Sequence, residues 1–375
     1  STRKESSAAS DVYKRQVFSG IGAAEQALKQ LKIPHEIVFA CDNGERYLDY
    51  SVEKINEIIN EHPKKDKESV IRKLYDSTGK PNNVKKSYFA NYKIKENQWF
   101  EDVRFLDGKQ YKGSIDLFVG GSPCQSFSTY GHRKGLEDTR GTLFYDYARL
   151  VLEIQPKAFI FENVTGLLNH DGGKTWKIIR ETFESLNYDI KMQILNAADY
   201  NLPQLRRRVF VVGINKKLKC PEYQFPKPVP LTKKSTDYLD KFVPNEYYLG
   251  EKGFNFVTKV ERSARRARVN QDIIGCQTAN QQFNWVGDFR VETPTESHMN
   301  DDRIFKGMYN GKLAVARKMT PNELLRLMGF ENFNVVVKDT VMWRQTGNSI
   351  AVPVIKAVIE EIINTLDKAE GEIDE

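Results

Sequence analysis

Residues 17–31 of the chain read VFSGIGAAEQALKQL, and the next apolar run, residues 36–42, reads EIVFACD. Gly20 and Gly22 stand between an expected strand and an expected helix. Glycine at such a turn lets the backbone approach a ligand, and the first N–H groups of the helix attract an anion. Asp42 ends the following strand about 20 residues further on, where an acid can hydrogen-bond ribose hydroxyls. The two segments predict the start of an α/β domain that binds an adenosine-bearing cofactor.

Alternation of strands and helices continues from this unit towards residue 215. Further apolar runs and amphipathic segments follow in turn at residues 115–121, 143–154, 157–164, 174–186, 188–197 and 207–215. This order is typical of a sheet covered by helices on both faces. We expect an α/β fold, doubly wound around a mostly parallel sheet, in which the Lys-rich stretch at residues 43–101 is an insertion.

The pattern changes after Cys220. A Pro/Lys-rich stretch, FPKPVPLTKK, leads into residues 230–312, which lack clear strand–helix alternation and carry polar, aromatic and basic clusters. We therefore expect a smaller second domain at residues 226–344. The larger domain is expected at residues 17–225.

Two local signals concern the ends of elements. Polar residues 14–16 occupy positions where a buried parallel strand should be apolar. Residues 1–16 are therefore expected to be a non-native or disordered segment. Further along, Thr320 is expected to cap a helix in which Glu323 completes a capping box.

Composition limits the class of protein. The chain has 375 residues, with 57 Lys and Arg against 50 Asp and Glu and a formal net charge of +7. Its 40% of hydrophobic residues suffices for sizeable cores, and it has no apolar run of the about 18 residues that a membrane span needs. Four cysteines without a C-x-x-C pair predict neither a disulfide framework nor a metal site, and they fit a reducing compartment. We expect a soluble, intracellular protein whose modest positive charge permits a polyanionic partner.

Residues 120–131, GGSPCQSFSTYG, place Cys124 in a Gly/Ser-rich loop after a strand. Ligands bind at this end of an open parallel sheet, and a cysteine thiolate suits attack on a soft electrophilic carbon. A structural cysteine would have apolar neighbours, whereas these are polar. Glu162 ends another strand and is a candidate general acid if burial raises its pKa; the alternative is a helix cap or a solvated loop acid.

The stretch QLRRR adds two cationic candidates. Arg206 and Arg208 lie on the same side of a strand by its period of two, and inward-facing guanidinium groups there need acidic or phosphate partners.

Taken in order, these segments resemble the motif series of the DNA (cytosine-5)-methyltransferases, and most of all the compact bacterial enzymes of restriction–modification systems. The matching segments are FSGIG (18–22), Asp42, Asp102 with Val103, SPCQSFS (122–128), FENV (161–164), QLRRR (204–208), RKMTPNELLRLMGF (317–330) and QTGNS (345–349). The pairing of Pro-Cys-Gln with Glu-Asn-Val at this spacing is highly specific. The resemblance implies a Rossmann-like methyltransferase fold with a target-recognition domain as the second domain.

The resemblance also implies roles for the catalytic residues. Cys124 would add to C6 of a cytosine, and Glu162 would protonate or hydrogen-bond N3 and the exocyclic amine. Arg206 and Arg208 would hold O2 and order the site. C5 would then take the methyl group of S-adenosyl-L-methionine, which leaves as S-adenosyl-L-homocysteine.

For the cofactor, the family pattern assigns residues from four separate stretches. Along the methionine moiety lie Phe18, Gly20 and Gly22; on the ribose lies Asp42; on the adenine lie Asp102 and Val103; and Asn348 with Ser349 complete the pocket. The resemblance therefore implies that the larger domain is catalytic and cofactor-binding and that residues 345–375 complete it.

The expected partner is double-stranded DNA, from which the target base must be flipped out because C6 cannot be reached inside the stack. Residues 129–141 resemble a mobile loop that closes over the base. The DNA-contacting residues expected in and beside this loop and in the recognition domain are Ser128, Lys134, Arg140, Arg265, Arg266, Arg268, Gln281 and Gln282. A Thr-Leu pair that usually closes the recognition region is not evident in this sequence.

The resemblance further implies a monomeric, cytoplasmic enzyme of bacterial or phage origin, associated with the nucleoid and not with a membrane. A cognate restriction endonuclease would be its genetic rather than physical partner. The alternatives are a tRNA cytosine-5 methyltransferase, which shares the catalytic set, and a catalytically impaired DNA-binding relative. A Rossmann oxidoreductase is disfavoured, since Glu25 stands where a dinucleotide fingerprint has its third glycine.

Overall fold

The computed structural model describes residues 13–15, 19–63, 66–121, 143–258, 267–282 and 284–371. Its main sheet contains strands in the order β5–β6–β9–β7. These strands are Leu117–Gly120 (β5), Ala158–Val164 (β6), Arg207–Asn215 (β9) and Tyr188–Asn196 (β7). β5 runs parallel to β6, whereas β9 runs antiparallel to both of its neighbours.

The direction of β9 follows from the short connection that precedes it. Residues 197–206 join β7 to β9 and contain a 3-10 turn, Ala197–Asp199, and the two-residue strand β8, Gln204–Leu205. A parallel crossover needs a dozen or more residues, usually with a helix. The α/β class predicted from the alternation is confirmed, and the sheet at its centre is mixed.

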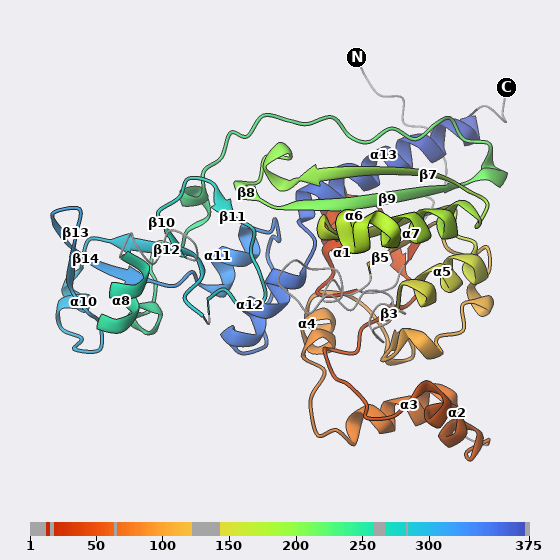
Figure 1. Ribbon diagram of the computed structural model, residues 1–375, viewed down its shortest axis with the longest axis horizontal. Helices are drawn as coiled ribbons and strands as arrows, with labels where there is room; N and C mark the ends of the chain where they lie inside the picture. The colour runs from red at the N-terminus through yellow and green to blue at the C-terminus, as the bar shows by residue number, and fades with distance from the viewer. Residues whose placement is uncertain are drawn as a thin grey trace.

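Helices cover both faces of the main sheet (Figure 1). They are α1 (Ala23–Leu31) and α13 (Val352–Gly371) on one face, and α5 (Leu143–Ile154) and α7 (Lys174–Glu184) on the other. Within β6, Ala158 and Ile160 pack in the first core, whereas Phe159 and Phe161 pack in the second. Because both faces are buried, the strand reads as a nearly continuous apolar run.

Two pairs of short parallel strands lie outside the main sheet. β1 (Tyr13–Arg15) pairs with β2 (His35–Ile37), and β3 (Ala40–Cys41) pairs with β4 (Trp99–Phe100). Residues 13–15 belong to the segment 1–16, which the sequence predicts to be non-native or disordered, and they form a paired strand. Strand pairing uses backbone N–H and C=O groups, which every residue type except proline supplies. Polar side chains alone therefore do not exclude a strand here.

The residues without clear alternation build a second, smaller sheet in the order β10–β12–β14–β13. Its strands and helices are Ala267–Val269 (β10), Gly287–Glu292 (β12), Lys312–Arg317 (β14), Gly307–Tyr309 (β13), Glu251–Thr258 (α8) and Glu296–Met299 (α10). Phe254, Phe289 and Ala316 are central to its core. β11 (Ile274–Gly275) follows β10 in the sequence but is not part of this sheet. It pairs in parallel with β8 of the larger part.

The helix α11 (Pro321–Arg326) begins as its sequence predicted. Oγ1 of Thr320 accepts from the N–H of Glu323, and the Glu323 carboxylate accepts from the N–H of Thr320. α12 (Asp339–Asn348) follows and leads through Ser349 into α13.

The insertion between β3 and β4 is helical. It contains α2 (Val52–Asn60), α3 (Lys67–Asp76) and α4 (Asn83–Asn91), and Figure 1 shows α2 and α3, in orange, extending from the body of the molecule. Ile55, Ile71 and Tyr75 pack with Phe105, and Tyr88 packs with Trp99. In the described part of the chain, none of the helices is both long and apolar enough to cross a membrane.

Candidate active site

Glu162 and Arg208 face each other at the ends of the neighbouring strands β6 and β9. Oε1 of Glu162 lies 3.2 Å from Nε of Arg208, and the two side chains are 15% and 16% exposed. Burial raises the pKa of Glu162, while the positive charges of Arg208 and Arg206 act in the opposite direction. The carboxyl group therefore holds a proton more readily than an exposed glutamate, as a general acid requires.

The end of β5 lies beside Glu162. Gly120 is in register with Phe161, and a Cβ added to Gly121 would lie 2.3 Å from the carbonyl oxygen of Glu162. Only a glycine permits this approach. Cys124 follows Gly121 by three residues in the sequence and lies outside the described residues.

Arg206 lies in the turn between β8 and β9 and is 3% exposed. It donates from Nη1 to the carbonyl of Gln277 (2.8 Å) and from Nη2 to the carbonyls of Gly347 (3.0 Å) and Ser349 (2.5 Å). A guanidinium can bridge these carbonyls because its five N–H donors are held in a rigid fork. Arg206 thus links the segment at Gln277, which follows β11, to residues 347–349, whereas Arg208 pairs with Glu162.

Cys276 completes this group, and the sequence analysis did not select it. Arg206 Nη1 and Arg208 Nη2 donate to its Sγ at 3.5 and 3.6 Å. Burial raises the pKa of the thiol, but the charges and hydrogen bonds of the two arginines outweigh burial, so that its pKa lies below the ordinary value. No motif in the neighbouring sequence marks Cys276. It meets the two arginines because β11, just before it, pairs with β8, just before Arg206.

Asp42 lies directly after β3, half-buried beside the glycine turn. Its carboxylate accepts from the N–H of Gly20 (3.2 Å) and of Gly44 (2.8 Å). Burial raises the pKa of Asp42 to about 6, although these two backbone hydrogen bonds act to lower it. The turn and the acid, which the sequence predicted as partners, are therefore in direct contact.

The glycine turn leaves room for a ligand. Gly20 has φ +49°, a conformation that favours glycine, and a Cβ built on it would meet no atom of the described residues within 4 Å. Gly22 has φ +82°, and its Cβ would instead overlap the Tyr92 ring at 2.2 Å. Open space at Gly20 beside a ribose-binding type of acid fits an adenosine-bearing cofactor.

Asp102 and Val103 follow β4, the parallel neighbour of β3, and both are buried. The Asp102 carboxylate accepts from Nε and Nη2 of Arg104 at 3.0 and 2.7 Å. It also accepts from the hydroxyl of Tyr75 at 2.8 Å. Two parallel strands thus bring Asp42 and Asp102 to one edge of the sheet, as the predicted topology requires.

The C-terminal motif returns to this edge. Asn348 donates from Nδ2 to Oε1 of Glu45 (2.7 Å), and Arg344 donates to Oε2 of the same carboxylate (3.0 Å). Glu45 comes three residues after Asp42 and was not selected from the sequence. A series of contacts therefore runs from Glu162 through the two arginines and residues 347–349 to Glu45, three residues after Asp42.

The described residues expected to contact DNA have internal partners. Gln281 and Gln282 are 3% and 1% exposed; Gln281 accepts from the N–H of Thr278, and Gln282 donates to the carbonyl of Asp288. Both amides are therefore used within the protein's own loops, and their contact with base edges stays a prediction. Arg268 is 44% exposed on its side chain and pairs with Asp288 at 2.8 Å.

Several predicted site residues lie outside the described residues. They are Phe18, Cys124, Ser128, Lys134, Arg140, Arg265 and Arg266.

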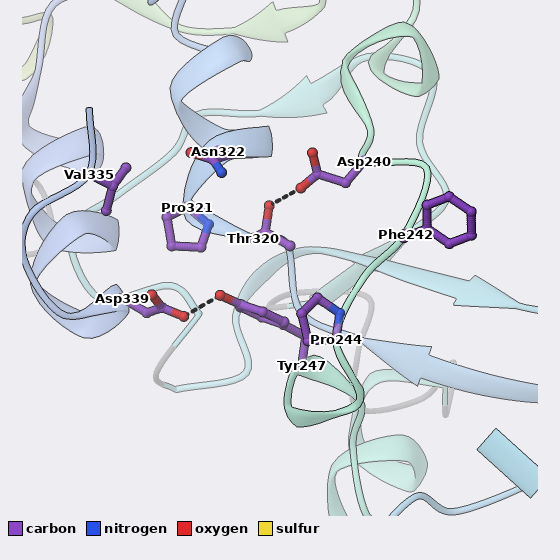
Figure 2. Close-up of a pocket in the computed structure, with 9 residues that line it drawn as sticks. All are labelled: Asp240, Phe242, Pro244, Tyr247, Thr320, Pro321, Asn322, Val335 and Asp339. Carbon is purple, nitrogen blue, oxygen red and sulfur yellow. Dashed lines mark hydrogen bonds between the residues drawn. The ribbon is translucent and has the colours of Figure 1, made fainter. Parts of the chain in front are cut away.

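A pocket of about 300 Å³ lies at a different place, between residues 240–247 and the starts of α11 and α12 (Figure 2). Thr320 donates to Asp240 across it at 2.6 Å, and Tyr247 hydrogen-bonds Asp339. Its wall contains none of the residues selected from the sequence as site residues. The pocket is thus a feature of the junction and separate from the Glu162 site.

Comparison with known proteins identifies the class. Residues 75–364 match the sequence family described as C-5 cytosine-specific DNA methylase. The chain is 39% identical over 291 residues to the Type II methyltransferase M.SsoII of Shigella sonnei, covering 76% of this chain and 72% of that protein. It is 34% identical over 303 residues to the Type II methyltransferase M.HpaII of Haemophilus parainfluenzae, covering 76% and 81%.

The fold also matches solved structures. The S. pombe Dnmt2 methyltransferase aligns with a TM-score of 0.64 at 18% identity, covering 95% of this chain and 99% of that one. The chain belongs to the C-5 cytosine-specific DNA methylase family and is a DNA cytosine-5 methyltransferase.

Proposed function

We propose that the protein methylates C5 of a flipped-out cytosine in a specific duplex DNA sequence, with Cys124 as nucleophile and S-adenosyl-L-methionine as methyl donor. The observation that supports this most directly is the connected group of Glu162, Arg208, Arg206 and the C-terminal motif. It extends from a proton-holding carboxyl group to Glu45, which lies three residues after Asp42, an acid that suits an adenosine ligand. This reaction requires a nucleophile, an acid and a cofactor pocket close together. Gly121 packs against the backbone of Glu162, and Cys124 follows Gly121 by three residues in the sequence.

Cytosine C5 is a weak nucleophile, so the ring must first be activated. The Cys124 thiolate adds to C6, and negative charge develops in the ring towards N3. Glu162, whose pKa is raised by burial, donates its proton or a hydrogen bond to N3 and so offsets this charge. S-adenosyl-L-methionine supplies the methyl group to C5 and becomes S-adenosyl-L-homocysteine. Loss of the C5 proton and elimination of Cys124 then restore the aromatic ring.

The two arginines have different parts in this proposal. Arg208 is partly exposed beside Glu162, where it can donate to O2 of the base and hold the carboxyl group in place. Arg206 is buried and donates to three backbone carbonyls, so it holds the segments around the site in place. Gly20, Gly22 and Asp42 would surround the methionine and ribose, with Asp102 and Val103 at the adenine and Asn348 and Ser349 closing the pocket.

We assign the smaller sheet and its helices to target recognition, with residues 226–344 as the recognition domain and residues 17–225 and 345–375 as the catalytic domain. The similarity to Type II methyltransferases supports a restriction–modification role, with a cognate endonuclease as a genetic partner. A monomer acting on DNA in the bacterial cytoplasm suffices for this role.

Trapping with 5-fluorocytosine tests the proposal. The full chain is incubated with S-adenosyl-L-methionine and a duplex library containing 5-fluorocytosine, and products are separated on a denaturing gel. Fluorine cannot leave as a proton does, so the enzyme should remain bound to DNA through Cys124. Sequencing the trapped DNA then identifies the target site.

Cys124→Ser should give no trapped band and should bind S-adenosyl-L-homocysteine within about threefold of the wild type. Cys220→Ser is the matched control and should trap normally. A band formed by Cys124→Ser would assign the nucleophile elsewhere. Trapping on tRNA but not on duplex DNA would overturn the proposed substrate, and folded protein that traps neither would indicate an impaired relative.

A further inference from the structure

The helical insertion carries a buried tyrosine that reaches the expected adenine site. Tyr75 is near the end of α3 and is 1% exposed, and its hydroxyl donates to Oδ2 of Asp102 at 2.8 Å. None of the motifs that define the site includes this residue. The contact links an inserted helix to an acid of the cofactor pocket.

Tyr75 completes the set of donors around Asp102. Arg104 supplies the others, from Nε (3.0 Å to Oδ1), from Nη2 (2.7 Å to Oδ2) and from its backbone N–H (3.1 Å to Oδ1). Arg104 belongs to the 3-10 turn that Asp102 caps, whereas Tyr75 belongs to a separate helix. The two donors therefore hold the carboxylate from different elements, which restricts its rotation more than either would alone.

Tyr75 is itself held in place. The guanidinium of Arg46 lies 4.9 Å from the centre of the Tyr75 ring, and Arg46 also pairs with the buried Glu101. Ile55, Ile71 and Phe105 pack around the ring. Burial and the charge of Asp102 raise the pKa of Tyr75, so its hydroxyl remains a donor.

The same insertion contacts two further cofactor stretches. Asn82, which caps α4, donates to the carbonyl of Asp42 at 2.8 Å, and Tyr92, just after α4, donates to the carbonyl of Gly22 at 2.8 Å. One segment of the chain thus supplies a polar contact to the glycine turn, to the ribose acid and to Asp102.

We propose that Tyr75 is a positioning residue of the cofactor pocket and that residues 52–92 are a brace for this pocket. The inference rests on the proposed function, in which Asp102 contacts the adenine. Tyr75 acts through Asp102: it holds the carboxylate in the orientation that accepts from the adenine amino group. Preorganisation of this kind contributes to affinity and not to the chemical step.

The test is Tyr75→Phe, which removes the hydroxyl and keeps the ring in its core. Calorimetric titration of the purified full chain with S-adenosyl-L-homocysteine should show affinity about five- to tenfold weaker. KM for S-adenosyl-L-methionine should rise by the same factor, and kcat at saturation should stay within about twofold. Tyr50→Phe removes a hydroxyl from an exposed tyrosine of the same region and should change neither quantity.

A double-mutant cycle separates positioning from general loss of structure. In an Asp102→Ala background, Tyr75→Phe should have no further effect on affinity, because the group through which it acts is absent. Unchanged affinity in Tyr75→Phe, or an equal loss in both backgrounds, would overturn the inference. If the wild type itself bound no S-adenosyl-L-homocysteine, the proposed function would fail instead, so the two failures are distinguishable.

Discussion

At Glu162, two physical effects act on one carboxyl group in opposite directions. Burial favours the neutral form and raises its pKa, while Arg208, 3.2 Å away, and Arg206 favour the charged form. Burial is the larger effect here. The pair can therefore hold a proton close to a cation, which suits a group that must give a proton to a base and recover it in each turnover.

Asp42 leads to a pH prediction. Its pKa is about 6 in the protein, and only the ionised carboxylate can accept hydrogen bonds from both ribose hydroxyls. Below pH 6 a proton must be lost before binding, so affinity for S-adenosyl-L-homocysteine should be about tenfold weaker at pH 5 than at pH 7. Calorimetric titration across pH 5–8 measures this.

Asp42→Asn is the control, since an amide does not titrate: its binding should be weaker and nearly flat over the same range. A wild-type profile as flat as that of Asp42→Asn would contradict the prediction. Stability of the free protein should follow the opposite trend. Because the folded pKa lies above the ordinary 3.8, the contribution of Asp42 to stability is full below pH 3.8 and is lost as the pH rises through 6.

Individual site residues were predictable where a motif fixed their spacing. Gly20 with Asp42, and Glu162 with Arg208, were selected from the sequence and are in contact. Cys276 and Tyr75 were not, because each meets its partner through pairing or packing of elements that no local pattern encodes. Gln281 was selected by side-chain type alone, and type does not distinguish a base-reading amide from one that satisfies a buried loop.

Among the elements, the apolar runs located β6, β7 and β9 correctly but did not determine their directions. Period and composition are the same for buried parallel and buried antiparallel strands, so direction depends on the length of the connection. The ten residues between β7 and β9 are too few for a helical crossover. Residues 230–312 were harder to interpret, because strands of three to six residues leave little periodicity to detect.

Close packing of β9 on β6 can be tested at Gly213. This glycine is in register with Phe159, and an added Cβ would lie 2.2 Å from a carbon of the Phe159 ring, which is fully buried. Gly213→Ala should lower the free energy of unfolding by about 1–3 kcal/mol, since the ring has no free space to enter. Denaturant unfolding measures the change.

The comparison variant is Gly250→Ala, in which the new Cβ would come no closer than 3.5 Å to the atoms around it. Its unfolding free energy should change by less than about 0.5 kcal/mol. Equal effects at the two glycines would show that β9 and β6 are packed less tightly than described.

Across the whole molecule, Arg206 connects segments that are far apart in the sequence. It donates to carbonyls at residues 277, 347 and 349 from a buried position. Arg206→Ala removes a charged donor from all three, and we expect a loss of about 3 kcal/mol in the free energy of unfolding together with weaker cofactor binding. Thermal unfolding with and without S-adenosyl-L-homocysteine reports both effects.

Arg207→Ala changes the neighbouring, exposed arginine and should alter stability by no more than about 0.5 kcal/mol. If Arg206→Ala were as stable as Arg207→Ala, the carbonyls would have to find other donors, and Arg206 would not hold the two parts together.

The contact between α1 and α13 has a consequence for biosynthesis. Ala27 and Leu28 of α1 are buried in a core that also contains Val358 and Ile362 of α13, although the two helices lie near opposite ends of the chain in sequence (Figure 1). A ribosome adding roughly 5–20 residues per second needs about 15–60 s to proceed from one helix to the other. During that time the nascent cofactor-binding half lacks one of its covering helices. Methylation of DNA by this protein therefore starts only after α13 has emerged and docked.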